Sequence, residues 1–114
     1  MAHSEYLAGV LRVLILSELS RGEGYGYGIA KGIARASGDE LTVRPESLYP
    51  VLHRMEEEGL VKARWKTAQT GRPRKVYTLT PKGKRRWDKA QREFKALSAA
   101  ALKVIDTNAA ESAS

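Results

Sequence analysis

The sequence predicts an α+β fold that is mostly α-helical and contains a single β-hairpin. Three patterns predict it. Apolar residues recur at helical spacing through most of the chain, an alternation with a period of two occurs directly after Gly59, and the last helical stretch carries a heptad spacing. The predicted units are a compact domain over residues 1–80, a helix over residues 81–105 that packs against another helix, and a disordered tail over residues 106–114.

Length and charge limit the possible functions. At 114 residues the chain is one domain, because single cores usually occupy about 100 to 200 residues. Its 20 lysines and arginines exceed its 13 acidic residues, and the net charge of +7 favours an anionic partner, either nucleic acid or an acidic membrane surface. No stretch reaches the roughly 20 apolar residues that span a bilayer, and no leader with a cleavage site is recognised, so we expect a soluble, cytoplasmic protein.

Few residues are suited to catalysis or metal binding. The chain contains no cysteine, which excludes a disulfide framework, a thiolate nucleophile and Cys-based metal sites. His3 and His53 are too isolated to form a metal site, and we expect neither a metal nor a cofactor. Glu56, Glu57 and Glu58 project in three directions from one predicted helix, so no catalytic residue is expected.

Two helices are predicted in the first third of the chain. From residue 5 to residue 20 the apolar positions indicate a helix buried on more than one side, with Ser4 as its N-cap. The second helix spans residues 25–36 despite three glycines. Their spacing does not match a phosphate-binding loop. We therefore interpret the glycines as sites of close helix packing, with Tyr25 and Tyr27 filling the space.

A short strand is predicted at residues 41–43, followed by a helix over residues 46–58 that ends at Gly59. If Ser47 caps this helix, Pro50 lies at its third position; if the helix begins at Pro45, an irregularity near Pro50 is expected. In either case the Ser47 end carries the positive pole of the helix dipole, which suits a phosphate. One face is apolar at the spacing i, i+3, i+4, i+7, formed by Leu48, Val51, Leu52 and Met55.

The alternation after Gly59 predicts a basic hairpin. The residues Val61, Ala63, Trp65 and Thr67 alternate with cations, and after a turn at residues 69–73 a second extended run covers residues 75–80. Thr80 and Pro81 then start the last helix as its cap and its first residue. Along that helix a heptad spacing is formed by Trp87, Ala90, Phe94, Leu97, Ala101 and Val104.

The order helix, helix, short strand, helix, hairpin is the succession of a winged helix-turn-helix domain. In that architecture the third helix enters the major groove of DNA, and the hairpin, or wing, lies along the backbone or the minor groove. Between residues 61 and 92 the chain carries twelve basic residues and one acid, so the positive charge is centred on the wing and the start of the last helix. If six of these residues contacted phosphates, DNA affinity would fall with salt with a log–log slope of about −5.

Several runs are also typical of one known family. They are SLYPVLHRMEEEGLV at residues 47–61, GYGY at residues 24–27, Trp65, RKVYTLT at residues 74–80, and Gly83. Together they closely resemble the PadR-type transcriptional regulators, and the resemblance covers Leu7 to about Leu102. It departs from the family pattern at Glu46-Ser47, where Gly-Thr is usual, and at Met55, where Leu is usual. Glu46 is the departure that would alter a phosphate or base contact.

The resemblance implies a homodimeric winged-helix repressor that is bound to a pseudo-palindromic operator and released by a small molecule. The short last helix would be the dimerisation helix of the short-tailed subgroup. Trp87 and Phe94 share one heptad position, and related regulators hold flat aromatic ligands between such helices and the first helix. An aromatic or apolar effector is therefore one interpretation of this pair, and ordinary interface packing is the other.

The candidates for DNA contact lie on the helix at 46–58 and in the wing: Ser47, Tyr49, His53, Arg54, Arg72, Arg74 and Lys75. Arg54 or His53 can donate to guanine N7 or O6. The alternative for Arg54 is an ion pair with Glu57 or Glu58 on its own helix, and the alternative for the wing is a solubilising face. Tyr49 is expected to lie half in the core.

The sequence thus predicts a DNA-binding transcriptional regulator whose partners are double-stranded DNA and a second copy of itself, with no membrane partner. Two recognition helices would enter successive major grooves about 34 Å apart on an inverted repeat. Two alternatives stay open: a winged-helix module that binds a partner protein, and a non-specific architectural DNA-binding protein.

Overall fold

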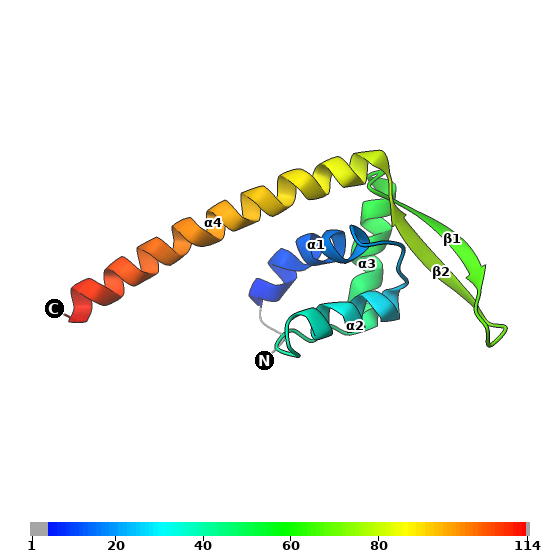
Figure 1. Ribbon diagram of the computed structural model, residues 1–114, viewed down its shortest axis with the longest axis horizontal. Coiled ribbons are helices and arrows are strands. Elements are labelled where there is room, and N and C mark those ends of the chain that lie inside the picture. The colour runs from blue at the N-terminus through cyan, green and yellow to red at the C-terminus, as the bar shows by residue number, and fades with distance from the viewer. Residues whose placement is uncertain (1–4, 114) are drawn as a thin grey trace.

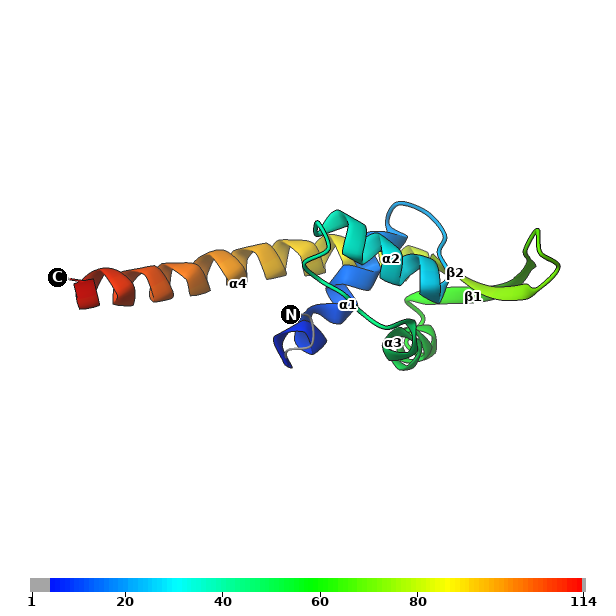
Figure 2. The same ribbon diagram turned by 90° about the horizontal axis from the view of Figure 1, so that it is seen from below.

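The computed structural model describes residues 5–113, and within them the chain forms four helices and one two-stranded antiparallel sheet (Figure 1). The predicted mostly helical α+β fold with a wing is confirmed. Helices α1, α2 and α3 cluster together, while the hairpin and α4 extend toward opposite ends of the molecule (Figures 1 and 2). The elements are, in order, α1 (Glu5–Leu19), α2 (Gly26–Ala36), α3 (Pro45–Glu57), β1 (Val61–Thr67), β2 (Pro73–Leu79) and α4 (Pro81–Ala113). The predicted N-cap Ser4 lies outside the described residues.

The core lies where the three helices meet the base of the wing. Helix α1 contacts α2, α4 and β2, which confirms its predicted burial on more than one side. The apolar face of α3 is also confirmed, because three of its four predicted residues are fully buried and Val51 is half-buried. The buried cluster consists of Leu11, Ile15, Leu16, Leu19, Ile29, Ala30, Ile33, Leu48, Leu52, Met55, Leu60, Val61 and Tyr77.

Close packing explains the glycines of α2, as predicted, but a different tyrosine fills the space at Gly26. A Cβ at Gly26 would lie 2.6 Å from the Cε1 atom of Tyr49 on α3. Tyr25 adjoins Gly28 as expected, whereas Tyr27 is 53% exposed. Gly26 therefore allows the Tyr49 ring to lie directly against the α2 backbone.

The predicted strand at residues 41–43 is not observed. These residues are a connection without ladder partners, and the side chains of Leu41 and Val43 pack against the core. The segment that pairs with the wing is instead the α1–α2 loop. The Gly24 N–H donates to the Tyr77 carbonyl at 3.0 Å, and the Tyr77 N–H donates to the Gly24 carbonyl at 2.8 Å. Residues 41–43 carry a strand-like pattern but pair with neither strand of the wing.

Helix α3 begins at Pro45, the earlier of the two predicted starts. Arg44 is its N-cap and makes no side-chain capping bond. Pro50 lies inside the helix, so the Glu46 carbonyl lacks its usual N–H donor. Gly59 follows the helix with a φ of 77°, the predicted left-handed conformation.

The wing is buried from its base as far as Val76 and exposed at its tip. Val61 pairs with Leu79 at the base, and Thr67 pairs with Pro73 near the tip. Trp65 lies on the same side of β1 as the buried Val61, yet it is 69% exposed because the wing extends past the helices (Figure 2).

The register gives the wing two faces, because successive residues of a strand point to opposite sides of the sheet. We call inner face the side formed by Ala63, Trp65, Lys75 and Tyr77. We call outer face the side formed by Arg64, Lys66, Arg74 and Val76.

Helix α4 starts as predicted. Pro81 is its first residue, and the Thr80 hydroxyl accepts a hydrogen bond from the Gly83 N–H at 3.0 Å. Thr80 also ties this start to the end of α3, since its N–H donates to the Leu60 carbonyl at 3.1 Å. Gly83 lies so close to Leu60 that a Cβ there would be 2.0 Å from the Leu60 carbonyl oxygen.

Helix α4 continues to Ala113, well past the predicted end at residue 105. The predicted boundary with a disordered tail at residues 106–114 is therefore not observed, since residues 106–113 are helical. No proline or glycine follows Gly83 to interrupt the helix. Near its start Trp87 and Ala90 pack against the core, whereas Leu97 and Val104 are 69% and 62% exposed. No helix within residues 5–113 is both long enough and apolar enough to cross a membrane.

Candidate nucleic-acid interface

The face of α3 opposite the core is open. Ser47, His53 and Arg54 are exposed, as predicted from the buried positions between them. Tyr49, which was expected to lie half in the core, is 47% exposed and has its ring against Gly26 of α2. The side chains supply a hydroxyl, a phenol, an imidazole and a guanidinium group. These are groups that contact phosphates and base edges in DNA complexes.

Ser47 is the third residue of α3 and does not cap it. Its N–H donates to the Arg44 carbonyl at 2.9 Å, and Pro45 has no N–H to offer. An anion at this end of α3 would therefore meet chiefly the Ser47 hydroxyl. Glu46, exposed in the same turn, would repel it.

The Arg54 side chain has no ion-pair partner, because the two glutamates that could pair with it lie against other side chains. Arg12 on α1 donates from both terminal nitrogens to the carboxylate of Glu58, and this contact lowers the pKa of Glu58. Glu57 lies 3.5 Å from the Nε2 atom of His53. Within residues 5–113 the Arg54 side chain forms no hydrogen bond or ion pair, although its charge also helps to lower the pKa of Glu58. Glu57, one of the two partners that we considered for Arg54, therefore lies beside His53 instead.

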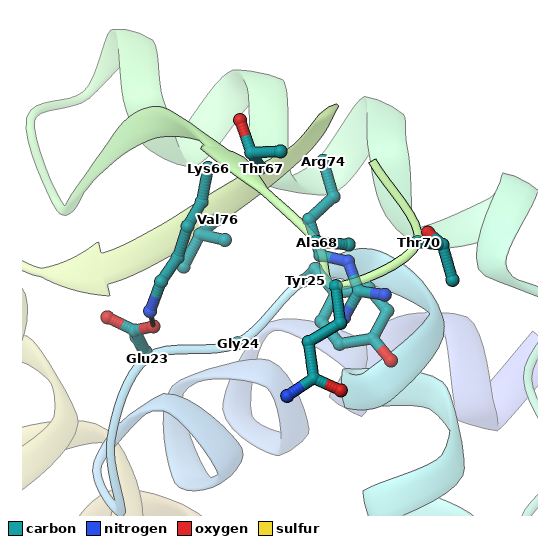
Figure 3. Close-up of a pocket in the computed structure, with 10 residues that line it drawn as sticks. Glu23, Gly24, Tyr25, Lys66, Thr67, Ala68, Thr70, Arg74 and Val76 are labelled. Atoms are coloured by element: carbon teal, nitrogen blue, oxygen red, sulfur yellow. Dashed lines mark hydrogen bonds and ion pairs between the residues drawn. The ribbon is translucent and has the colours of Figure 1, made fainter. Parts of the chain in front are cut away.

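The outer face of the wing is neutralised in part by Glu23 of the α1–α2 loop (Figure 3). Lys66 Nζ donates to one carboxylate oxygen at 2.7 Å, and an Arg64 terminal nitrogen donates to the other at 2.5 Å. The hydrogen bond from Lys66 is the main cause that lowers the pKa of Glu23, and Arg64 adds to it. Glu23 is thus ionised and paired at neutral pH, and the pairs are lost only as the pH falls through its lowered pKa.

The two arginines of the wing tip differ in their surroundings. The Arg74 guanidinium lies 4.0 Å from the centre of the Tyr25 ring, and Arg74 is half-buried. Both side chains are drawn in Figure 3. Arg72 is exposed in the turn, where its carbonyl accepts the Ala68 N–H at 2.9 Å. Its guanidinium has no partner among the residues that the structure describes. Arg72 is therefore the freer cation.

An open groove of about 520 Å³ lies between the inner face of the wing and α3. Four predicted contact residues line it, namely Tyr49, His53, Arg74 and Lys75, together with Trp65. Lys75 lies 3.6 Å from Glu56 on α3 and 5.7 Å from the ring centre of Tyr77. Burial of Tyr77 raises the pKa of its hydroxyl group. The other three predicted contact residues, Ser47, Arg54 and Arg72, do not line this groove.

The cations at the start of α4 are only partly engaged. Lys82 donates to the Glu58 carbonyl at 2.8 Å, and Arg92 lies 3.4 Å from Asp88. The side chains of the other exposed cations of the wing and α4 form no hydrogen bond or ion pair with the rest of the described chain: Lys62, Lys84, Arg85, Arg86 and Lys89.

Trp87 and Phe94 have different environments in the single chain. Trp87 is half-buried against the core, and Phe94, two turns further along α4, is 38% exposed. Neither residue lines the groove beside α3. Within residues 5–113 no cluster of three or more histidine, aspartate or glutamate residues could hold a metal ion.

Sequence reasoning missed two residues of this surface. Glu23 appeared only as part of a turn, because nothing in the sequence brings residue 23 next to residue 66. Trp65 appeared in the strand alternation and among the residues of the family resemblance, but not as a contact residue. A signal was available for it, since a tryptophan four positions beyond a buried strand start, between Arg64 and Lys66, is unusual for a core residue.

Comparisons with known proteins agree with this geometry. The family described as "Transcriptional regulator PadR-like family" matches residues 15–89. A transcriptional regulator of Mycobacterium tuberculosis is 32% identical over 80 residues, which are 70% of this chain and 71% of that protein. A PadR-like transcriptional regulator from Bacillus cereus has a similar structure, with a TM-score of 0.75 and 29% identity over 90% of this chain and 97% of that one. PadR of Bacillus subtilis, solved in complex with operator DNA, aligns with a TM-score of 0.65 and 30% identity over 72% of this chain and 46% of that one.

Proposed function

Since this chain belongs to the PadR-like family of transcriptional regulators, we propose that it is a homodimeric repressor that binds an inverted-repeat operator and leaves it when a small-molecule effector binds. It would act in the cytoplasm on operator DNA, with which PadR of Bacillus subtilis was solved in complex. The observation that carries the proposal is the open donor-bearing face of α3 beside the basic wing. Helix α3 would enter the major groove, and the wing would contact the backbone.

The charges of α3 and the wing indicate which of them contributes affinity for DNA and which contributes sequence specificity. Helix α3 carries Glu46, Glu56 and Glu57 against Arg54, so it adds little to the attraction of a polyanion. The wing tip and β2 carry Arg72, Arg74 and Lys75 and no acid, although Lys75 lies 3.6 Å from Glu56 on α3. We assign most of the affinity to the wing and the choice of sequence to Ser47, Tyr49, His53 and Arg54.

DNase footprinting over the promoter of the protein's own gene tests this function. We expect a protected segment with two-fold symmetry. We also expect unrelated duplex to compete more weakly by a factor of roughly 10³ or more, which is the lower end of typical specificity ratios. Equal affinity for promoter and random DNA would identify an architectural DNA-binding protein. Failure to bind any duplex would instead favour a module that binds a partner protein.

We assign dimerisation to the exposed apolar stripe of α4. Phe94, Leu97 and Val104 follow the heptad spacing and have no covering element within residues 5–113. An effector would bind between two such helices, near Trp87 and Phe94. Its class would be aromatic or apolar, because the groups that these positions present are rings and aliphatic side chains.

Leu97→Asp is expected to convert the protein from dimer to monomer at micromolar concentration, because a charge would be buried without a partner at the helix pair. Size-exclusion chromatography with light scattering measures this. Ala99→Asp is the matched control, since it adds the same charge to an exposed position on the opposite side of α4. A wild-type monomer at this concentration, or equal disruption by both variants, would contradict the assignment.

Glu23→Gln is expected to raise DNA affinity about three- to tenfold at moderate salt. Phosphates must displace Glu23 before they reach Arg64 and Lys66, and the carboxylate also repels them. The salt dependence should become steeper, because more cations are then available for phosphates.

Asp106→Asn is the matched control for Glu23→Gln, since it removes one exposed negative charge near the end of α4. Fluorescence anisotropy of labelled promoter DNA over a range of salt compares the two variants. The backbone bonds between Gly24 and Tyr77 should keep the wing in place in Glu23→Gln. Weaker binding by this variant would mean that Glu23 serves mainly to position the wing.

A further inference from the structure

The groove between α3 and the inner face of the wing contains an exposed tryptophan, whose presence there is not accounted for by attraction between the basic wing and phosphates. Trp65 is 69% exposed, and the core ends before it along β1. It is paired across the strands with Lys75, so the two side chains are neighbours on one face. A large aromatic side chain in water between two cations gives the folded monomer little stability, since its apolar area stays hydrated.

We propose that this groove receives one sugar–phosphate strand of duplex DNA and that Trp65 packs on the deoxyribose rings of that strand. The inference rests on the proposed function and names a contact residue that the charge pattern alone does not reveal. Trp65 supplies the apolar surface, while Lys75 on the same face supplies a cation for the adjoining phosphate.

The shape and chemistry of the groove favour a nucleic-acid strand over a compact ligand. The groove is open and continuous with the exposed side chains of Tyr49 and His53 on α3. A nucleic-acid strand combines apolar sugars with anionic phosphates, and the groove is lined by aromatic rings together with the cations Arg74 and Lys75. Lys75 is exchangeable, since its contact with Glu56 is 3.6 Å long and half exposed.

Because the contact is apolar and meets the backbone, its loss has two distinguishing features. Trp65→Ala should weaken specific and non-specific DNA binding by a similar factor, since deoxyribose is present at every position. It should also leave the salt slope unchanged, because no phosphate contact is removed. Removal of a wing arginine should instead reduce that slope.

The first measurement uses Trp65 itself as the probe. Trp87→Phe leaves Trp65 as the only tryptophan, and its emission can be followed while promoter duplex is added. We expect the acrylamide quenching constant of Trp65 to fall at least about twofold on saturation, because DNA would cover a side chain that is mostly in water. Anisotropy of labelled DNA, read in the same samples, reports binding independently.

The second measurement compares Trp65→Ala with Trp65→Phe, both checked for unchanged helix content by circular dichroism. We expect Trp65→Ala to weaken binding about tenfold at every salt concentration and Trp65→Phe to retain most of the affinity. Arg72→Ala is the contrasting control, with a reduced salt slope.

The outcomes separate this inference from the proposed function. If anisotropy reports DNA binding while the quenching of Trp65 is unchanged, the groove is not a strand site, and the repressor assignment is unaffected. A Trp65→Ala variant with wild-type affinity would also overturn the inference. If no duplex binds, the proposed function itself fails.

Discussion

Gly83→Ala is expected to lower the free energy of unfolding by about 3 kcal/mol, although alanine is the better helix former. The reason is the junction between α3, β1 and α4. The new Cβ would lie 2.0 Å from the Leu60 carbonyl oxygen and 3.2 Å from a methyl of Leu79. A backbone atom cannot rotate away, so α4 must move, and the hydrogen bonds of Thr80 to Gly59 and Leu60 would be strained.

Urea unfolding at fixed protein concentration measures the effect of Gly83→Ala. The matched control is Gly9→Ala, because Gly9 lies inside α1 and an added Cβ would meet nothing within 4 Å. That variant should be unchanged or more stable by up to about 1 kcal/mol. Equal stability of the two variants would mean that the α4 junction tolerates expansion and that the close approach at Gly83 has no energetic weight.

Replacing Arg72 and Arg74 together by alanine is expected to weaken DNA binding on the order of 100-fold at moderate salt. Each of the two replacements removes one charge-assisted hydrogen bond to a phosphate, which contributes about 1.5 kcal/mol or more to the binding free energy. The log–log salt slope should become shallower by about 2. Arg74→Ala also loses the contact with the Tyr25 ring, so the single variant Arg72→Ala isolates the phosphate contact from wing positioning.

Lys95→Ala combined with Lys103→Ala is the control for the wing arginines, because it removes two exposed cations from α4. Its affinity should fall far less at about 150 mM salt, where charges beyond about 8 Å are largely screened. Anisotropy titrations of the same promoter fragment compare the two double variants. If Arg72 and Arg74 can be removed without weakening binding, the wing is not part of the DNA interface.

Local patterns were sufficient for most of the fold. The helical spacing of Leu48, Leu52 and Met55 predicted the buried face of α3, and Thr80-Pro81 predicted the start of α4. These predictions hold because capping and amphipathic spacing act within a few residues of the chain. The pattern at residues 41–43 failed because a strand needs a partner edge. In the folded chain the edge of β2 is taken by Gly24, which the sequence places in a turn.

The candidate site divides in the same way. The sequence by itself determined which α3 residues are outward and that the wing is basic, because both follow from periodicity and charge. Only the tertiary structure decided which cations are free: Glu23 reaches across to Arg64 and Lys66, while Arg12 holds Glu58 and so leaves Arg54 unpaired. It also decided that Trp65 lies beside α3 and not in the core. Such pairings join residues about 40 positions apart, and their energies depend on distances that only the packed chain sets.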